Sequence, residues 1–452
     1  MRIVISASSF RPPLFGGGEV YVCRVAREFL RLGLDVTVVT SAPWKTGTAP
    51  YLIEKHFFEG IGVTSLSVDP SRIDQAELQT GMGPVVLNGI KEILQEHRPD
   101  LVHVNGLKPP MTVACAEFRI PHVVTAHHAG IACPLGTLVR SSGSFCGDAM
   151  SPHRCVPCAG YERWPRWFTG GLISRMPSAV YQSLGRRLND SAGLSYLERG
   201  LIYPWIVEKT VAAKKAVLDL AGIIIAPSAA IRNLLLRNGR DPETVVTVPH
   251  GVEHLGRDRT EKQEGGTIRF GYVGRIEYLK GLHVILEALE RIPGGRCELH
   301  VFGAPRQAWD EEYLKKAVTR YRGIAPVRFH GYVPSGKLSD AYGEFDVLIV
   351  PSLLPEAFGL VVAEAFSAGK PVIVFDSGAL PEQVAHGENG FIISEKNGPS
   401  LAAAMQTFIE NPGLAAQMSK RTPRPKTISE HADDLMDIYN RARAADAACC
   451  AL

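Results

Sequence analysis

The chain has 452 residues, of which 45% are hydrophobic and 21% charged, and its formal net charge is +3. This length accommodates two or three domains, and the composition is that of an ordinary globular protein rather than a disordered or fibrous one. The small net charge gives no argument for nucleic acid as a partner.

The N-terminal segment and the cysteine content indicate a reducing compartment. Residues 1–6 contain a very short apolar run that leads into a glycine loop, so they indicate a first strand rather than a signal peptide. No apolar run is long enough to cross a membrane, since the closest, residues 216–230, contains Asp219 and Pro227. Nine cysteines, an odd number, fit reduced thiols or a metal site better than a disulfide framework. We therefore expect a cytoplasmic protein.

In the first part of the chain, short β-branched runs alternate with amphipathic helical patterns. The predicted strands are residues 2–6, 35–40, 101–104, 122–125, 222–226 and 245–248, with helices such as 21–32 and 84–97 between them. This rhythm predicts a doubly wound, Rossmann-like α/β domain over residues 1–255, with an insertion at about residues 130–215.

The same rhythm restarts after a charged, glycine-bearing linker at residues 256–266. The predicted strands are residues 268–273, 298–302, 327–330, 347–350, 371–375 and 391–393, and the predicted helices are 281–291, 310–321, 359–368 and 399–409. A second Rossmann-like domain is therefore expected over residues 256–426. Open sheets of this kind bind ligands at the carboxyl ends of their strands.

Each domain has glycines after its first strand, where the backbone can approach an anion closely. In the first domain these are Gly16, Gly17 and Gly18; the pattern is neither the dinucleotide fingerprint nor the Walker loop. In the second domain, the turn from Gly271 to Gly281 supplies Arg275 and Lys280, which can bracket a diphosphate. The alternative is that Arg275 pairs with Glu277 while Lys280 faces water.

Two glutamates eight positions apart, Glu356 and Glu364, are the most informative pair in the chain. Glu356 lies in a loop after an apolar strand and can accept hydrogen bonds from sugar hydroxyls, whereas Glu364 lies about two turns into the next helix and suits a ribose. The first N–H groups of that helix, at Gly359, Leu360 and Val361, are free to meet a phosphate. The alternative is a helix that carries two glutamates on its solvated face.

These motifs, together with residues 249–252 (Pro-His-Gly-Val), resemble the retaining glycosyltransferases of family 4, which have the GT-B fold. The resemblance covers most of the chain, from Met1 to about Tyr439. It implies two Rossmann-like domains that face a central cleft, with a C-terminal helix, residues 427–445, that crosses back to the N-terminal domain. It also implies transfer of a sugar from a nucleotide-diphosphate sugar to a sugar or a lipid-linked glycan acceptor, in the synthesis of a cell-surface glycan.

The resemblance assigns roles to residues of the second domain. Arg275 and Lys280 are expected to neutralise the donor diphosphate, Glu356 to contact the donor sugar and Glu364 to bind the ribose. Two cations and a helix N-terminus make a catalytic metal unnecessary. The remaining donor-binding residues that the resemblance implies are Gly16, Gly17, Gly18, Gly274, Tyr332 in the loop along the base, Phe358, Gly359, Leu360 and Val361.

In the first domain, the resemblance makes His127 the histidine that reaches the donor sugar from the acceptor side. His128 stands where the family usually has Asp, which puts any role for position 128 in doubt. A structural, hydrogen-bonded histidine is the alternative for His127. No carboxylate of this domain is singled out as a nucleophile, which agrees with front-face displacement assisted by a donor phosphate oxygen.

Four cysteines within the insertion, Cys133, Cys146, Cys155 and Cys158, have a spacing that suits a structural zinc site. A Cys155–Cys158 redox pair and four unrelated loop thiols are the alternatives. Beyond them, the basic and aromatic stretch of residues 161–215 suits either peripheral contact with an anionic membrane face or the packing of a helical insertion.

Two other functional classes stay open at this point. A sugar-nucleotide epimerase of the same two-lobed shape would consume the donor without an acceptor. A non-catalytic sugar-nucleotide sensor would bind the donor and leave it intact. The donor sugar, the nucleotide base, the linkage and the oligomeric state do not follow from the sequence.

Overall fold

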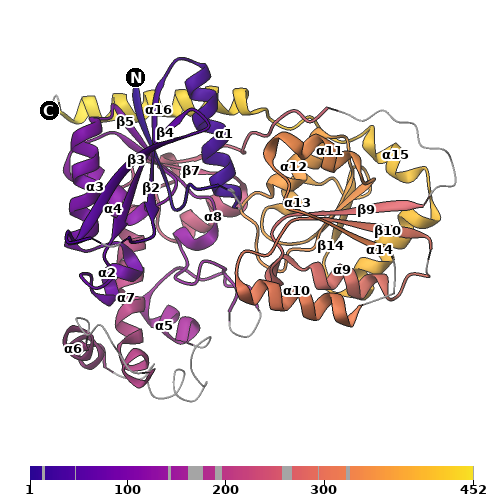
Figure 1. Ribbon diagram of the computed structural model, residues 1–452, viewed down its shortest axis with the longest axis horizontal. Coiled ribbons are helices and arrows are strands. Elements are labelled where there is room, and N and C mark those ends of the chain that lie inside the picture. Colours follow the sequence, from indigo (N-terminus) through magenta and orange to yellow (C-terminus); the bar gives the residue numbers. More distant parts are fainter. Residues whose placement is uncertain are drawn as a thin grey trace. The chain divides into compact units, whose positions relative to one another are not determined.

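The computed structural model contains two compact α/β units (Figure 1). Unit 1 consists of the N-terminal strand, Gly18–Val248 and the segment from Ala432 onward, and unit 2 consists of Gly16, Gly17 and Pro249–His431. The division between the units thus lies at residues 248/249 and 431/432, near but not at the expected boundaries of 255/256 and 426/427. The structure describes residues 1–12, 16–45, 47–140, 144–160, 177–188, 196–256, 267–293, 295–321 and 326–450.

Unit 1 is built on a sheet whose strand order, over the residues described, is β3-β4-β2-β1-β5-β6-β7-β8. All neighbouring strands are parallel except β3 and β4. Val4, Ile5, Val102 and Val124 in its central strands are at most 2% exposed, because helices cover both faces of the sheet. The strands are β1 (Arg2–Ala7), β2 (Asp35–Ala42), β3 (Tyr51–Phe58), β4 (Ile61–Val68), β5 (Leu101–Val104), β6 (His122–Thr125), β7 (Ile223–Ala226) and β8 (Val245–Thr247).

The antiparallel hairpin of β3 and β4 was not among the predicted strands. Its two-residue turn has Glu59 at φ 49° and Gly60 at φ 80°, as a type I′ turn requires. The Glu-Gly pair between two apolar runs was the available signal. The hairpin extends the edge of the sheet beyond β2.

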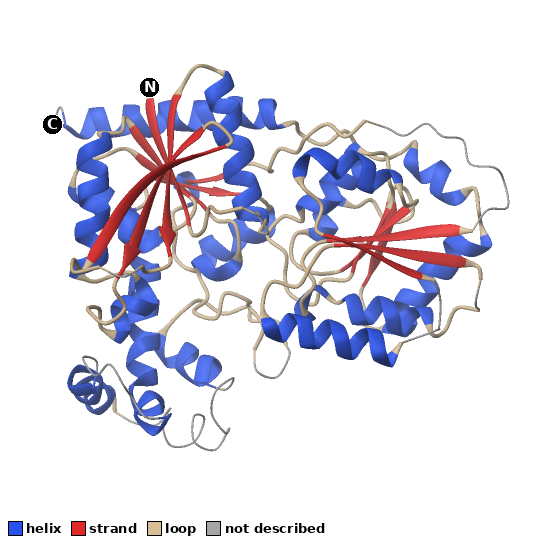
Figure 2. Ribbon diagram, viewed as in Figure 1, coloured by secondary structure: helices blue, strands red, loops and turns tan. Residues whose placement is uncertain are grey.

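Figure 2 shows the helices of unit 1 around its sheet. In α1, for example, Tyr21, Val25 and Phe29 recur at helical spacing and are at most 1% exposed. The helices are α1 (Gly17–Arg31), α2 (Gln75–Thr80), α3 (Pro84–His97), α4 (Lys108–Glu117), α5 (Pro152–Gly160), α6 (Ser178–Leu188), α7 (Tyr196–Leu220) and α8 (Ala229–Arg237), with short 3-10 turns η1 (Ala129–Ile131) and η3 (Pro242–Thr244).

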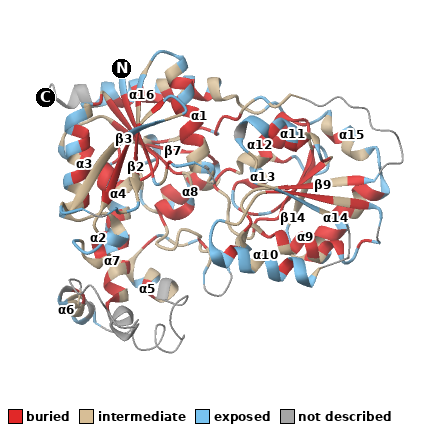
Figure 3. Ribbon diagram, viewed as in Figure 1, coloured by how far each residue is buried: buried red, intermediate tan, exposed pale blue. Residues whose placement is uncertain are grey.

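Unit 2 has a wholly parallel sheet of order β11-β10-β9-β12-β13-β14 in the described residues. Its central strands are buried (Figure 3), and Phe270, Leu299 and Ile373 are 0% exposed, whereas the edge strand β11 is largely exposed. The strands are β9 (Ile268–Val273), β10 (Cys297–Phe302), β11 (Val327–Gly331), β12 (Val347–Val350), β13 (Val372–Phe375) and β14 (Gly390–Ile393).

The helices of unit 2 alternate with these strands, as the pattern of a doubly wound domain predicts. They are α9 (Leu282–Leu289), α10 (Ala308–Arg320), α11 (Leu338–Gly343), α12 (Leu360–Ser367), α13 (Leu380–Gln383), α14 (Gly398–Glu410) and α15 (Leu414–Ser419), with 3-10 turns η4 (Tyr278–Lys280) and η5 (Ser335–Lys337).

The C-terminal helix α16 (Ile428–Cys450) connects the two units. Thr427, just before it, forms a parallel bridge with Val252 in unit 2. From Ala432 onward the helix belongs to unit 1, where Tyr439 is fully buried. The Tyr439 hydroxyl lies 2.6 Å from Nδ1 of His103 on β5, and its ring lies 5.6 Å from that of Phe29. No helix in the described ranges combines the length and apolarity that a membrane crossing needs.

Candidate functional site

The turn after β9 carries the predicted cations and is held in place by glycines. Gly274 has φ 151°, and Gly281 has φ 76°, in the left-handed region. A Cβ added to Gly281 would lie 2.1 Å from the carbonyl oxygen of Pro351. The turn that contains Arg275 and Lys280 is therefore packed directly against the loop that follows β12.

Lys280 contacts Glu356 in the structure. Its Nζ lies 2.5 Å from Oε1 of Glu356, and the Ser352 hydroxyl donates to the same oxygen at 2.5 Å. Burial, the largest influence, raises the pKa of Glu356, but Lys280, Ser352 and Arg275 together lower it below its usual value. The carboxylate is thus ionised and part-buried, and the interpretation that Lys280 merely faces water is wrong.

Arg275 pairs with Glu277, as the alternative interpretation expected. The distance from Arg275 Nη2 to Glu277 Oε1 is 3.1 Å, and the arginine side chain is 37% exposed. Its carbonyl oxygen accepts a hydrogen bond from the Tyr272 hydroxyl at 2.5 Å, which fixes the backbone of the turn. The exposed guanidinium can exchange Glu277 for another anion at a low energetic cost.

The backbone of Glu356 is fixed by the loop after β13. Its N–H donates to Ser377 O at 3.3 Å, and its carbonyl oxygen accepts from Ala379 N at 2.8 Å. A Cβ added to Gly378, which has φ 65°, would lie 2.3 Å from the Glu356 carbonyl oxygen. Loops at the carboxyl ends of β9, β12 and β13 therefore converge on this one residue, where parallel sheets bind ligands.

Helix α12 begins beside Glu356, with Gly359 as its N-cap at φ 86°. Gly359 supplies no side-chain cap, so the N–H groups of Leu360 and Val361 at this end of the helix suit an anion. The Phe358 side chain is only 9% exposed and lies against His250, with ring centroids 5.3 Å apart. Phe358 can therefore serve a donor through its backbone and not through an exposed ring.

Glu364 lies on the same helix but is almost fully buried, with 6% exposure. Its Oε2 accepts a hydrogen bond from the Tyr342 hydroxyl at 3.0 Å, and Tyr342 itself is 0% exposed. The alternative of two glutamates on a solvated helix face is therefore wrong. The role of Glu364 toward a ribose stays a prediction.

The loop after β11 carries Tyr332, which is 38% exposed. Just before it, His330 stacks on Phe302 with ring centroids 4.2 Å apart and an interplanar angle of 12°. His330 Nε2 also lies 3.2 Å from Nδ1 of His300, whose pKa is lowered by burial and then by His330. The predicted base-binding loop is thus lined by planar side chains.

In unit 1, His127 follows β6 and lies within a group of polar and aromatic side chains. Its Nε2 is 2.5 Å from Oδ1 of Asn105, which follows β5, and its ring lies 4.7 Å from that of Tyr21 on α1. A Cβ added to Gly18 would lie 3.8 Å from His127 Cγ, so the start of α1 lies at van der Waals distance from this ring. Sequence reasoning missed Asn105, although its place directly after a buried strand was the signal.

The structure gives the unexpected His128 a local role. Its Nδ1 accepts a hydrogen bond from Gly130 N at 2.9 Å and so caps η1. Asp is a favoured capping residue for the same reason, since its side-chain oxygen accepts from an N–H at the start of a helical turn. The imidazole of His128 thus caps this turn, as a carboxylate at the same position can.

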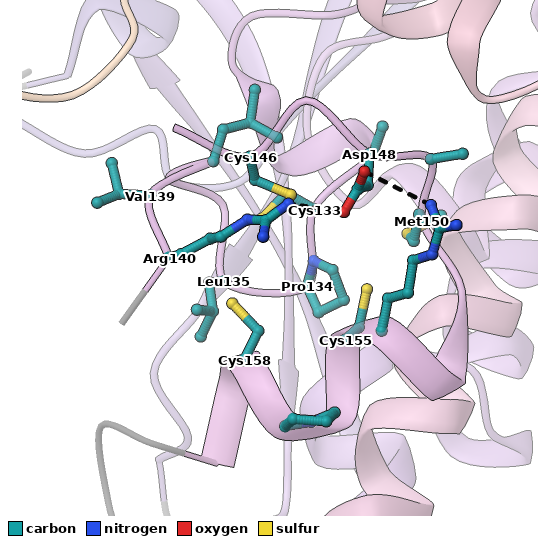
Figure 4. Close-up of a pocket in the computed structure, with 15 residues that line it drawn as sticks. Cys133, Pro134, Leu135, Val139, Arg140, Cys146, Asp148, Met150, Cys155 and Cys158 are labelled. Carbon is teal, nitrogen blue, oxygen red and sulfur yellow. Dashed lines mark hydrogen bonds and ion pairs between the residues drawn. The ribbon is translucent and has the colours of Figure 1, made fainter. Parts of the chain in front are cut away.

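The four cysteines of the insertion line one cavity of about 410 Å³ (Figure 4). Cys133 follows η1, Cys146 follows an isolated bridge of Val139 with Phe145, and Cys155 and Cys158 are on α5. Across the described residues, no three Cys, His, Asp or Glu side chains are already arranged to hold a metal ion. The structure therefore brings the predicted thiols together without forming a coordination sphere, and zinc stays a prediction.

Part of the aromatic and basic stretch can be compared with its two interpretations. Trp205 on α7 is 6% exposed, and a Cβ added to Gly185 on α6 would lie 2.4 Å from its ring. Lys209 lies over the same ring at 5.5 Å. Trp205 thus packs inside the insertion. Residues 161–176 and 189–195, which include Trp164 and Trp167, lie outside the described residues.

Two family models match the chain. The model described as "Glycosyl transferase 4-like domain" matches residues 16–251, and "Glycosyl transferases group 1" matches residues 257–424. Similar proteins include glycogen synthase of Mycobacterium tuberculosis, 26% identical over 445 residues, which is 95% of this chain and 91% of the relative. D-inositol 3-phosphate glycosyltransferase of Corynebacterium diphtheriae is 29% identical over 459 residues, 96% of this chain and 92% of the relative.

Solved structures resemble the chain over nearly its whole length. Anabaena HepE, in complex with UDP and glucose, matches with a TM-score of 0.65 and 18% identity over 97% of this chain and 99% of that chain. Sucrose-phosphate synthase from Thermosynechococcus elongatus matches with a TM-score of 0.66 and 18% identity, covering 98% and 99%. The expected GT-B fold is confirmed.

Proposed function

Because this chain belongs to the glycosyl transferase 4-like family and carries a group 1 glycosyl transferase domain, we propose that it is a retaining glycosyltransferase that acts on a nucleoside-diphosphate sugar. The observation that carries the donor side of this proposal is the contact of Lys280 and Ser352 with Glu356, beside the uncapped start of α12. Cations and N–H groups suit the diphosphate, and the fixed carboxylate suits the sugar hydroxyls.

In the reaction we propose, the bond from the anomeric carbon to the diphosphate oxygen breaks as the acceptor hydroxyl oxygen bonds to the same face of that carbon. The hydroxyl proton passes to an oxygen of the departing diphosphate. Arg275, Lys280 and the N–H groups of Leu360 and Val361 stabilise the negative charge that develops on the leaving group. His127, positioned by Asn105, contacts the donor sugar from the side of unit 1. None of these steps requires a metal ion.

For the acceptor, we propose a sugar of a growing or lipid-linked cell-surface glycan, with peripheral contact to the cytoplasmic face of the membrane. Relatives named for glycogen and for inositol 3-phosphate favour two other acceptors, a storage polysaccharide and a phosphorylated polyol. A membrane-bound acceptor predicts transfer to extracted glycolipid, whereas the other two predict transfer to soluble glycan or to inositol phosphate.

The decisive test is a screen of nucleotides and nucleotide sugars by thermal shift, followed by transfer assays with the stabilising donor. A ligand that binds only the folded state raises stability with the logarithm of its concentration. The anomeric configuration of the product, measured by NMR, must match that of the donor. Consumption of the donor without an acceptor would instead indicate an epimerase, and binding with no turnover on any acceptor would indicate a sensor.

A further inference from the structure

Two lysines of unit 1 lie beside the His127 cluster and have no assigned role. Lys108 is the first residue of α4, and its ammonium donates to the carbonyl oxygen of Asn105. Lys214 lies on α7, and its ammonium donates to the carbonyl oxygen of Gly130. Asn105 follows β5 and Gly130 follows β6, so the two lysines reach the ends of the neighbouring strands that carry Asn105 and His127.

The charges of this pair are not balanced by carboxylates. Within the described part of the chain, neither ammonium has an Asp or Glu partner, and the hydrogen bonds they donate go to main-chain oxygens. Burial and then the charge of Lys214 lower the pKa of Lys108 to about 7, and burial lowers the pKa of Lys214. Two part-buried like charges cost folding free energy, and such an arrangement is typical of a binding site.

We propose that Lys108 and Lys214 bind an anionic group of the acceptor, either a phosphomonoester or a carboxylate, next to His127. This inference rests on the proposed function, because it places the acceptor next to the histidine that we propose contacts the donor sugar. Asn105 links the two features: its carbonyl oxygen accepts from Lys108, and its side chain lies 2.5 Å from His127. The position of the anion would thus set which acceptor hydroxyl reaches the donor.

The test uses the full chain with the donor site filled by saturating UDP, so that added anions cannot bind there. Glucose 6-phosphate, glucuronate and glucose are then compared by thermal shift. The double variant K108M/K214M is compared with K215M, which removes an exposed lysine adjacent in sequence on α7. We expect at least one of the two anionic sugars to bind about tenfold or more tightly than glucose, and the double variant to lose this preference.

Each outcome is decisive. Stabilisation by glucose 6-phosphate alone identifies a phosphate site, and stabilisation by glucuronate identifies a carboxylate site. Equal affinity for glucose and both anions, or an unchanged preference in K108M/K214M, overturns the anion site. UDP binding is measured separately. If UDP does not bind, that result contradicts the proposed donor site and not the anion site of Lys108 and Lys214.

The cysteine cavity carries a second, independent proposal. Cys133, Cys146, Cys155 and Cys158 come from three separate parts of the insertion and all line the same cavity, with their sulfur atoms directed toward its interior (Figure 4). The surrounding segment has a small core, made mainly of Met150, Val156, Val207 and Val211. We infer that a structural Zn²⁺ draws the four thiolates together, releases their protons and fixes the insertion.

Metal analysis of the full chain, purified without chelator, tests this directly. We expect about one zinc per chain, lost in C146S/C158S and retained in C297S, whose thiol is buried in β10 of unit 2. Thermal stability should fall when the zinc is removed. A metal-free chain with a disulfide that peptide mass mapping locates between Cys155 and Cys158 would establish the redox pair, and four reactive thiols with no metal would establish unrelated cysteines.

Discussion

Lys280 and Glu356 are 76 positions apart in the sequence, yet Lys280 Nζ lies 2.5 Å from Glu356 Oε1. The contact joins a cation expected at the donor diphosphate to a carboxylate expected at the donor sugar. With Ser352 on the same oxygen, the two charges form one electrostatic unit. Substitution at either position must therefore affect the other.

The first prediction concerns this pair. E356Q and K280M should each lower transfer about 100-fold or more, since each removes a preorganised charge from the site. Each should also cost about 1–3 kcal/mol of stability, because the remaining charge is part-buried and unpaired. The double variant should cost less than the sum of the two, as measured by urea unfolding. If the losses of the two single variants add up to that of the double variant, the contact between Lys280 and Glu356 contributes nothing to stability.

Arg275 should respond differently, because its partner Glu277 is not expected to bind the donor. R275Q should lower kcat/KM for the donor by about tenfold to 100-fold, the effect of a lost charge-assisted hydrogen bond. E277Q frees the guanidinium and should leave kcat/KM unchanged or raise it. Steady-state kinetics at varied donor concentration checks both. A loss of activity in E277Q equal to that in R275Q would mean that the ion pair itself is required.

Removal of the His127 imidazole should separate transfer from nucleotide binding. We expect H127A to lower transfer about 100-fold, and N105A to lower it less, because Asn105 only positions the ring through its 2.5 Å contact. Neither variant should change the thermal shift produced by UDP, since the nucleotide is expected to bind unit 2. Wild-type transfer by H127A would support the structural interpretation of this histidine.

The close packing of the β9 turn predicts that Gly281 tolerates no side chain. G281A adds a Cβ 2.1 Å from Pro351 O and strains a residue at φ 76°, so we expect a loss of about 3 kcal/mol or more. G295A is the matched control, since it has φ 82° but no atom within 4 Å of the added Cβ. It should cost only about 1–2 kcal/mol. Equal midpoints of urea unfolding for the two variants would contradict the close approach of Gly281 to Pro351.

The lysine pair predicts a pH dependence of stability. The pKa of Lys108 is lowered from 10.5 to about 7 in the folded chain, so between these values the unfolded chain binds more protons. The free energy of unfolding should therefore rise with pH across this window. The destabilisation caused by burying the charged Lys108 should be fully present below pH 7. The groups that set it are Lys108 and Lys214, with Cys133 near the latter.

K108M should reduce this slope, leaving the part that the buried Lys214 sets, and should raise the melting temperature near neutral pH, as measured by thermal unfolding from pH 6.5 upward. K215M should keep the wild-type slope. A slope in K108M equal to that of the wild type would assign the titration to another group.

Local sequence patterns were sufficient to predict the two α/β units and the positions of most of their strands in the sequence. Runs such as residues 101–104 and 347–350 are apolar and β-branched, and such a pattern is enough for strands that are buried on both faces. The same patterns placed His127, Arg275, Lys280, Glu356 and α12 correctly after strands. Ligand-binding groups are expected at such positions because the carboxyl ends of parallel strands meet at one edge of their sheet.

Which of these groups touch depended on the folded chain. The contacts of Lys280 with Glu356, of Asn105 with His127 and of Glu364 with Tyr342 join different strand connections, and no periodicity in the sequence encodes them. The same holds for Lys108 and Lys214, which come from α4 and α7. The physical reason is that propensity and periodicity act within one element, whereas the partner of a charged side chain depends on which elements the fold places next to each other.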